Sequence, residues 1–353
     1  MKNFIAGCLC FFLVGSIFAQ DQHFSQFYAS PLTLNPALTG ALEGKYRVSM
    51  IYRDQWRNAL DNPYQTYSAA ADFRYKLRQY KKRYRDAFGV GVVFYNDKVN
   101  EINFSTNQIM LSSAFHKALN PESNQFLSLG VQLGMVQRNI NYDQLSFDDQ
   151  FNGTDLFSDP TAEAFPENNF AFSDFQVGLH YSYAPRGKAG VFAGLAMHHI
   201  LEPEISFFYR ELPDDDKDER LSQTLYRKYS GHFNLRLPLG DKVLFQPRAQ
   251  FASQGPHFSM NVGASFRFLA NEISGTAIHL GSWFRPARNV NKDWGTDAVV
   301  AMIGIEHENF LLGFSYDISA QQLGINSRNQ NSFEISVAYL GEYEDETVLC
   351  PKF

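Results

Sequence analysis

Apolar and polar residues alternate in two-residue steps along most of this chain. Between residues 258 and 268 one parity is apolar throughout, with Phe258, Met260, Val262, Ala264, Phe266 and Phe268. The residues between them are small or polar. Successive side chains of a β-strand point to opposite faces, so this stretch predicts a strand with one apolar and one polar face. Its length fits a membrane-spanning strand, which needs roughly 9–11 residues.

The same alternation predicts about fourteen strands along the chain. They lie near residues 46–53, 67–76, 88–95, 104–115, 127–138, 175–183, 189–200, 229–237, 243–251, 258–268, 278–284, 298–306, 310–318 and 333–340. An apolar face towards lipid and a wet interior require this arrangement. We therefore predict an all-β fold, a transmembrane antiparallel β-barrel over residues 45–340.

The lengths of the connections predict how this barrel is oriented in the membrane. The gaps 139–174 and 201–228 follow the fifth and seventh strands, and 286–297 and 319–332 follow the eleventh and thirteenth. The tight turns 184–188, 238–242 and 306–309 follow even-numbered strands. Bacterial barrels have short periplasmic turns and long outer loops. This sorting predicts an outer-membrane barrel, and the two longest loops are where we expect an external partner to bind.

Composition narrows the class further. A mean hydropathy of -0.30 excludes a bundle of transmembrane helices but is compatible with a barrel, whose strands are half polar. Phe and Tyr contribute 33 and 18 residues, which suits aromatic girdles at both membrane interfaces; an aromatic-rich β-sandwich core is the alternative. The net charge of -6 gives no indication of a nucleic-acid partner.

The two ends of the chain lie outside the predicted barrel. Residues 1–19 read as a signal peptide, with Lys2, an apolar run and a cleavage site near Ala19, so we expect the mature protein in the cell outer membrane. Residues 20–44 form an extended periplasmic lead or a plug, and 341–353 a periplasmic tail. Cys350 is the one cysteine after cleavage, which excludes an intramolecular disulfide.

The lead carries three aromatic anchors, Phe24, Phe27 and Tyr28. Asn35-Pro36 favours a turn, and Gly40 permits a positive φ. Such a segment either closes the barrel mouth or offers an edge to a partner. Because aromatic side chains so close to a barrel tend to be buried, closure is the favoured interpretation.

Two charged runs suggest further sites. The basic run 76–85, with Lys81, Lys82 and Arg83, lies on a periplasmic connection and either docks an acidic partner or forms a solvated turn beside lipid headgroups. The acidic loop 213–220 lacks the spacing of a calcium loop, which favours a solvated loop.

No metal site or cofactor is expected. His198 and His199 are adjacent, so as strand residues they would point to opposite faces and could not share a metal ion. Glycines on the inward parity, among them Gly89, Gly91 and Gly130, mark a bend or a close backbone approach, and the curvature of a barrel is a sufficient structural reason for them.

No catalytic motif is recognisable. The chain has no G-x-S-x-G elbow and no phosphate-binding loop, although a triad assembled from distant strands would leave no local pattern. We expect no enzyme activity, and an outer-membrane hydrolase is the weakest of the hypotheses.

Three segments carry a resemblance to a known family. They are "DQHFSQFYASPLTLNPALTG" at residues 21–40, "YRDQW" at 52–56 and the terminal "CPKF". They resemble the PorP/SprF family of type IX secretion outer-membrane proteins of Bacteroidetes. The resemblance marks as signature positions Phe24, Ser25, Gln26, Phe27, Tyr28, Pro31, Asn35, Pro36, Thr39 and Gly40.

The resemblance implies a structural or interaction role. Family members are associated with type IX secretion and, in gliding bacteria, with surface adhesins. The implied partners are outer-membrane lipid, a secreted protein with a type IX C-terminal domain and periplasmic secretion-ring proteins. A docking or anchoring platform is therefore one hypothesis. A passive channel or small-molecule transporter is the other, because about fourteen strands enclose a lumen too wide to be filled by strand side chains alone.

Overall fold

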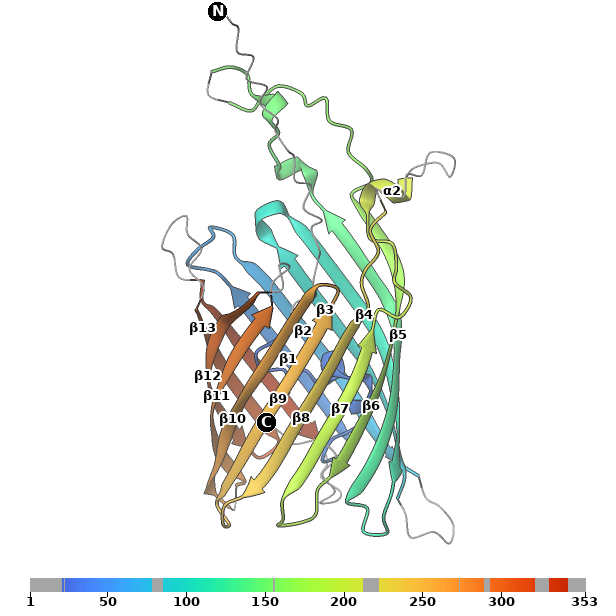
Figure 1. Cartoon of the computed structure of the whole chain (residues 1–353), viewed down its shortest axis with the longest axis vertical. Coiled ribbons are helices and arrows are strands. Elements are labelled where there is room, and N and C mark those ends of the chain that lie inside the picture. Colours follow the sequence, from blue (N-terminus) through green and yellow to red (C-terminus); the bar gives the residue numbers. More distant parts are fainter. Residues whose placement is uncertain are drawn as a thin grey trace, which may run out of the picture.

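Fourteen antiparallel strands close on themselves in the computed structural model of the chain (Figure 1). The structure describes residues 21, 23–77, 85–154, 156–211, 222–272, 274–288, 293–320 and 330–341. Every strand pairs with its neighbours in sequence, and β1 pairs with β14 from Tyr46↔Gly341 to Gln55↔Ser332. The predicted all-β barrel of about fourteen strands is confirmed.

The elements follow one another without a crossover. The strands are β1 Tyr46–Gln55, β2 Tyr64–Lys76, β3 Ala87–Val99, β4 Phe104–Ala118, β5 Gln125–Ile140, β6 Asn169–Tyr183, β7 Gly190–His198, β8 Lys228–Pro238, β9 Val243–Gln254, β10 His257–Asn271, β11 Thr276–Arg288, β12 Trp294–His307, β13 Phe310–Ser319 and β14 Ser332–Gly341. The helical turns are α1 Pro31–Leu34, η1 Pro36–Leu38, η2 Asn100–Ile102, η3 Tyr142–Gln144, η4 Asp148–Gln150 and α2 Phe207–Glu211. Within the described ranges, helices capable of crossing a membrane are absent.

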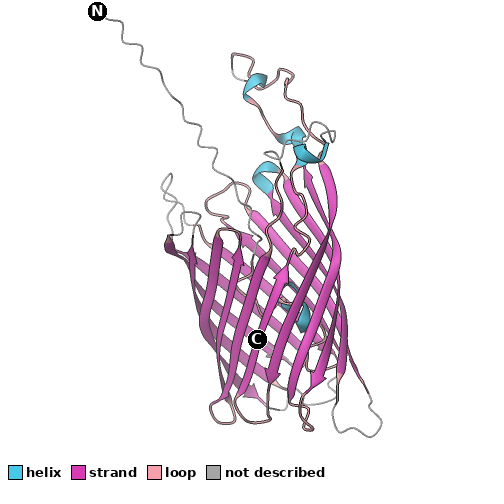
Figure 2. Ribbon diagram, turned by 45° about the vertical axis from the view of Figure 1, so that its right-hand side comes forward, coloured by secondary structure: helices cyan, strands magenta, loops and turns pink. Residues whose placement is uncertain are grey.

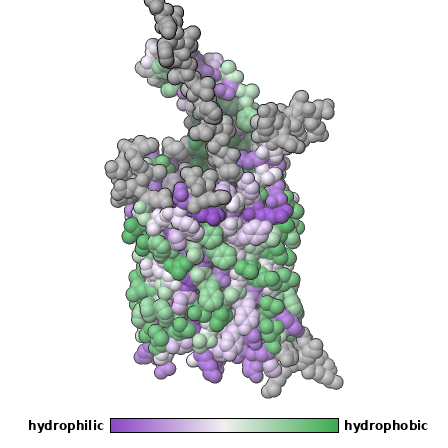
Figure 3. Space-filling model, in the orientation of Figure 1, coloured by the Kyte–Doolittle hydropathy of each residue, from purple (hydrophilic) through white to green (hydrophobic). Residues whose placement is uncertain are grey.

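The two-residue alternation separates an outer apolar face from an inner polar one. On β5, Leu129 and Leu133 point outward, while Ser128 and Gln132 are buried on the lumen side. On β10, Val262 points outward and Asn261 inward. Apolar side chains accordingly cover most of the visible wall at mid-height (Figure 3). This surface matches the apolar band of a membrane barrel.

The two longest connections and three of the short turns lie at opposite ends of the barrel (Figure 2). Residues 141–168 and 199–227 connect strands at one end, here called the long-loop end. The turns 184–189, 239–242 and 308–309 lie at the other, the short-turn end. Residues 141–168, which we call the external arm, project away from the barrel above β5 and β6 (Figure 1).

The β5–β6 hairpin is longer than the sequence predicted. β6 begins at Asn169, six residues before the predicted start at Phe175, and pairs Phe170 with Arg138 of β5 and Phe172 with Val136. Val136 and Phe172 are buried against Ile205 and Leu225 of the 199–227 loop. The hairpin therefore rises above neighbouring β7, and the loop covers its inner side.

Candidate functional site: the segment inside the barrel lumen

Residues 21 and 23–44, here called the lumenal segment, lie inside the barrel, where α1 and η1 are visible through the wall (Figure 2). At the long-loop end, the Asp21 amide donates to Gln254 Oε1 at 2.8 Å. At the short-turn end, the Lys45 amide donates to the Gly341 carbonyl at 3.0 Å. The described residues thus run through the lumen from one end to the other.

The segment contacts almost the whole circumference of the wall. Its hydrogen bonds reach β1, β2, β4, β5, β6, β7, β8, β9, β11, β13 and β14. Ser25, Gln26, Asn35 and Thr39 are at most 1% exposed. Buried polar groups need partners, and here side chains of many strands supply them.

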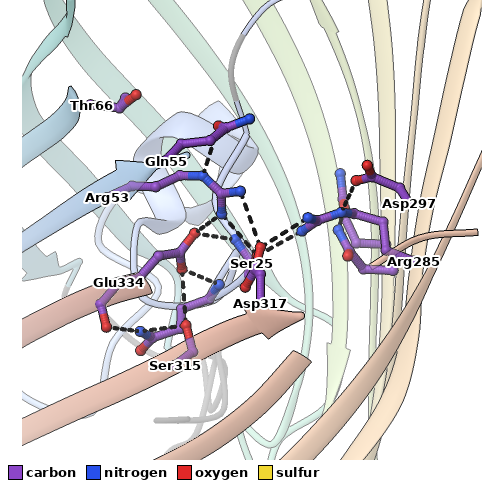
Figure 4. A network of polar contacts seen from close by, with 12 residues as sticks. Ser25, Arg53, Gln55, Thr66, Arg285, Asp297, Ser315, Asp317 and Glu334 are labelled. Atoms are coloured by element: carbon purple, nitrogen blue, oxygen red, sulfur yellow. Dashed lines mark hydrogen bonds and ion pairs between the residues drawn. The ribbon is translucent and has the colours of Figure 1, made fainter. Parts of the chain in front are cut away.

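Ser25 lies in the densest part of this contact (Figure 4), and Gln26 follows it in the chain. Both backbone amides donate to the Glu334 carboxylate of β14, at 2.6 and 2.8 Å. The Ser25 hydroxyl donates to Asp317 Oδ2 of β13 at 2.6 Å. The same hydroxyl oxygen accepts from Arg53 of β1 at 3.0 Å and from Arg285 of β11 at 2.7 Å.

These six residues, Ser25, Gln26, Arg53, Arg285, Asp317 and Glu334, form what we call the polar latch. Arg53 forms ion pairs with Asp317 at 3.1 Å and with Glu334, and Arg285 pairs with Asp317 at 2.9 Å. All four charged side chains are at most 3% exposed. Two guanidinium groups thus face two carboxylates, and in such a buried cluster the loss of one partner leaves an uncompensated charge.

The three aromatic anchors of the segment are buried. The Tyr28 ring stacks on Trp283 with 5.7 Å between centroids, and the Arg248 guanidinium lies 4.3 Å from the Tyr28 ring centroid. Phe27 meets Tyr28 edge-on, and Phe24 contacts Tyr95 of β3 in the same way. Aromatic pairs of this kind add to the free energy of burial and fix the orientation of the rings.

Asn35 shapes the turn between α1 and η1. Its Oδ1 accepts the Ala37 amide at 2.8 Å and caps η1, which begins with Pro36. Its Nδ2 donates to the carbonyls of Leu179 on β6 and Leu195 on β7, at 2.9 and 3.2 Å. One amide side chain therefore both starts the helical turn and attaches it to the wall. Pro31 is the first residue of α1, as Pro36 is of η1, and it is buried.

Thr39 and Gly40 attach the segment near the short-turn end. The Thr39 carbonyl lies 2.8 Å from His116 Nε2 of β4. Gly40 has a φ of +70°, the region that glycine permits, and its amide donates to Asp72 Oδ2 of β2 at 2.7 Å. Asp72 is also paired with Arg47 of β1 at 2.8 Å.

Glycines in the wall mark where the segment passes. A Cβ on Gly130 would lie 2.3 Å from the Pro36 carbonyl carbon, and a Cβ on Gly89 only 2.1 Å from the Thr39 oxygen. The interpretation of these glycines as consequences of barrel curvature was therefore wrong. Close approach of a second backbone is the reason, which is the other common use of glycine in a strand.

The N-terminal end of the segment is held by a second charged cluster. His199 Nε2 lies 2.7 Å from Asp21 Oδ2, and His199 Nδ1 lies 2.9 Å from Asp174 Oδ2. Lys228 Nζ also pairs with Asp21, at 3.1 Å. Burial alone would lower the pKa of His199, but the Asp21 and Asp174 carboxylates outweigh it and raise that pKa to about 9. Burial likewise opposes ionisation of Asp21, yet His199 and Lys228 hold its pKa well below the ordinary value.

The adjacent histidines do not lie on opposite faces. His198 ends β7 and contacts Gln176 and Ser230 inside the barrel. His199 follows the strand with a φ of +56°, so the alternation stops and its ring is buried on the lumen side as well. In the part of the chain that the structure describes, no group of three or more His, Cys, Asp or Glu residues is placed to hold a metal ion.

Some sequence hypotheses fall on positions that the structure does not describe. These are the signal peptide 1–19, Lys81, Lys82 and Arg83 of the basic run, the acidic loop 213–220, and the C-terminal tail from residue 342, with Cys350. The ten signature positions of the lead, in contrast, all lie in the lumenal segment.

The strand residues of the latch were not predicted as a site from the sequence, although Arg53 lies within the YRDQW motif. Arg53, Arg285, Asp317 and Glu334 are charged residues within largely alternating strands. Charges on the lumen parity of four separate strands are the signal that would have found them. Pairing them requires the closed barrel, because β1 and β14 meet only at its seam.

Comparison with solved structures finds several similar chains. Among solved structures, it is similar to a Pseudomonas aeruginosa FadL homologue, with 11% identity, a TM-score of 0.48, and 92% of this chain and 95% of that chain covered. The CymD monoaromatic hydrocarbon channel gives 12% identity, a TM-score of 0.47 and coverage of 90% and 94%. BamA from Haemophilus ducreyi lacking POTRA domains 1–3 gives 10%, 0.42, and 84% and 70%.

Sequence comparison is more specific than these structural likenesses. A search of curated proteins gave no match. The family model described as type IX secretion system membrane protein PorP/SprF matches residues 16–339, which is nearly the whole chain. The barrel fold and this match agree in pointing to the outer membrane and to a secretion component instead of an enzyme, and the chain belongs to the PorP/SprF family.

Proposed function

We propose that this barrel is a docking platform in the outer membrane for a secreted surface protein that leaves the cell by type IX secretion. The external arm binds the partner outside the cell, and the barrel with its lumenal segment is the rigid base. The family match supports a role in this secretion system. A surface adhesin with a type IX C-terminal domain is the partner that we infer.

The occupied lumen favours a platform over a passive channel. The lumenal segment crosses the barrel from end to end and is bonded to strands around most of the wall. A solute passing through would have to go around or displace a segment whose charged contacts are buried. An open fourteen-stranded pore does not require a segment in its lumen, whereas a rigid base is stabilised by one.

The observation that carries the proposal is the composition and exposure of the external arm. Residues 141–168 contain seven carboxylates and no Lys, Arg or His. Near its end, Phe151 and Phe157 form an isolated bridge, and these side chains are 47% and 52% exposed. Leu156 beside them is 59% exposed. Exposed apolar side chains gathered on one projection mark an interaction site.

The arm also indicates the chemistry of its partner. The Phe165 ring packs against Tyr142 and Phe147 with 4.8 Å between centroids in each pair, which stiffens the lower part of the arm. The end then presents apolar side chains, with carboxylates on both sides of them in the sequence. Aromatic anchors supply affinity, and charge of one sign favours a partner of the other sign. We infer a protein surface that is apolar at its centre and basic around it.

A surface-display experiment tests the proposal. The triple variant Phe151→Ser, Leu156→Ser, Phe157→Ser is expressed in place of the native barrel, and the proteins exposed on intact cells are compared with those released into the medium. Loss of one exported protein from the surface, with its appearance in the medium, is the expected result. Normal display of every exported protein would overturn the proposal.

A matched control separates the arm from the loops in general. Leu201→Ser and Phe208→Ser remove equally exposed side chains from the neighbouring 199–227 loop. These variants should leave display unchanged. Heat-dependent mobility on gels confirms that each barrel has folded, so a display defect can be assigned to the arm.

A further inference from the structure

A cavity of about 350 Å³ lies between the lumenal segment and the wall. The N-terminal part of the segment, with Asp21 and Phe24, lines one side. Arg138 of β5 and Gln254 of β9 line others, near the long-loop end of their strands. Sites for small ligands have volumes of roughly 300–1,000 Å³, so the cavity is large enough for a compact organic molecule.

Much of the cavity wall is apolar. Phe24 and Phe27 contribute from the segment, Phe104 and Val136 from β4 and β5, and Leu225 from the 199–227 loop. An apolar surface enclosed in this way favours the burial of a hydrocarbon or aromatic body.

The charged groups that line the cavity differ in whether the protein supplies them with partners. Asp21 pairs with both His199 and Lys228, so these three charges are compensated within the protein. Asp97 of β3 accepts the Thr66 hydroxyl at 2.6 Å. Arg138 is different: its Nε is buried without a hydrogen-bond partner, and its guanidinium lies 5.8 Å from the centroid of the Phe104 ring.

Asp21 is the carboxylate whose charge acts on Arg138, and it is already paired with His199 and Lys228. The neighbours of Arg138 across the strands are Thr106 on β4 and Phe170 on β6. Within the described ranges, no Asp or Glu forms an ion pair with it, in contrast to Arg53 and Arg285 lower in the same lumen. A half-buried guanidinium beside an apolar cavity is suited to bind an anion with two parallel hydrogen bonds.

We propose that this cavity binds a small organic acid, with the acid group on Arg138 and the apolar body against Phe24, Phe104 and Val136. The inference concerns the lumen and stands apart from the docking role of the external arm. The same chemistry is present in a free small acid and in the C-terminal carboxylate of a short apolar peptide, and the test includes both.

Binding is measured on the full-length mature barrel in nanodiscs of neutral phosphatidylcholine, with empty nanodiscs as background. The probes are 2-naphthoate and its uncharged analogue 2-naphthamide, which share one apolar body. We expect saturable binding of 2-naphthoate about ten- to a hundredfold tighter than that of 2-naphthamide, as a hydrogen-bonded charge contributes. N-acetyl-Val-Phe and its C-terminal amide form the peptide arm.

Variants assign the preference to one side chain. Arg138→Gln should abolish the preference for the acid while leaving binding of the amide unchanged, and Arg138→Lys should retain part of it. Arg236→Gln is the matched control, because Arg236 is a half-buried arginine of β8 near the short-turn end and does not line the cavity. It should bind both probes as the native chain does.

Each outcome decides the matter. A preference for 2-naphthoate alone identifies free organic acids as the ligand class, and an equal preference for the peptide acid identifies a chain terminus. Both results support the site when Arg138→Gln removes the preference. Equal affinity for acid and amide, absence of saturable binding, or a preference that survives in Arg138→Gln would each overturn the proposal.

Discussion

The lumenal segment and the external arm use similar residues in opposite ways. Phe24, Phe27 and Tyr28 of the segment are at most 7% exposed. Phe151 and Phe157 of the arm are about half exposed, as is Leu156 between them. Asp21 of the segment has cationic partners, whereas the arm contains no Lys, Arg or His. Aromatic and acidic residues alone therefore do not distinguish a structural from an interaction segment; their neighbours do.

This contrast predicts that changes in the segment alter the barrel itself, whereas changes in the arm alter only what it binds. The largest effect is expected for Arg53→Met. The substitution leaves Asp317 and Glu334 with Arg285 as the remaining latch cation, and breaking a buried pair costs about 3–5 kcal/mol. The temperature at which the folded gel band disappears should fall, and planar bilayers should show conductance steps that the native barrel lacks.

The matched control for this variant is Arg227→Met. Arg227 pairs with Glu202 on the loop, and both side chains are close to half exposed. Exposed pairs of this kind contribute about 0–1 kcal/mol, so this barrel should resemble the native one. An Arg53→Met barrel that is equally silent and equally heat-resistant would show that the latch does not hold the segment.

A smaller loss of stability is expected for Gly130→Ala. The new methyl group would lie 2.3 Å from the Pro36 carbonyl carbon, so the segment must shift. Overpacking of this kind costs about 1–3 kcal/mol. Thermal unfolding monitored by circular dichroism measures it.

Gly304→Ala on β12 is the comparison for Gly130→Ala. Its methyl group would find its nearest neighbours at 3.3 Å, a contact that small adjustments relieve. Equal unfolding temperatures for the two variants would argue against a closely packed segment at Pro36.

The charged cluster at Asp21 predicts a dependence on pH. The pKa of His199 rises from its ordinary value near 6.5 to about 9 in the folded barrel. Its contribution is thus fully present below pH 6.5 and is lost as the pH rises through about 9, with a size on the order of 3 kcal/mol. The pKa of Asp21 is lowered, so its contribution is present above the ordinary value and lost in acid.

The difference between native chain and His199→Gln isolates this effect. Their unfolding temperatures should differ most near pH 6 and converge by about pH 10. A difference that is constant over this range would mean that the imidazole is uncharged in the folded barrel.

The smallest effect on stability is expected for the arm. The triple variant Phe151→Ser, Leu156→Ser, Phe157→Ser removes side chains that are about half exposed or more. Surface changes of this kind alter the free energy of unfolding by no more than about 0.5 kcal/mol each. An unfolding temperature several degrees below that of the native barrel would show that the arm packs on the barrel and does not stand free.

The sequence was sufficient for the wall and insufficient for the lumen. A two-residue period identifies strands such as β10 because one face contacts lipid and the other water, and each position can be assigned by itself. The latch cannot be found in this way. Glu334 and Arg53 meet because β14 closes on β1, and that register is a property of the whole barrel.

The two misassigned features have related causes. Gly130 was attributed to curvature because a second backbone inside the barrel leaves no local pattern in β5. The prediction that His199 points to the opposite face from His198 treats both as strand residues. In the structure β7 ends at His198, and His199 has a positive φ. Burial of the aromatic anchors was easier to predict, because large apolar side chains next to a barrel tend to be buried whatever their exact site.

The position of Ser25 and Gln26 has a consequence for biogenesis. Their bonds to Arg53 and Glu334 join the first strand of the cylinder to the last. These bonds are complete only when the segment lies inside the wall and β14 is in place, and a chain truncated before β14 lacks the carboxylate that receives both backbone amides. Occupation of the lumen and closure of the seam are therefore coupled, because each completes contacts that the other uses.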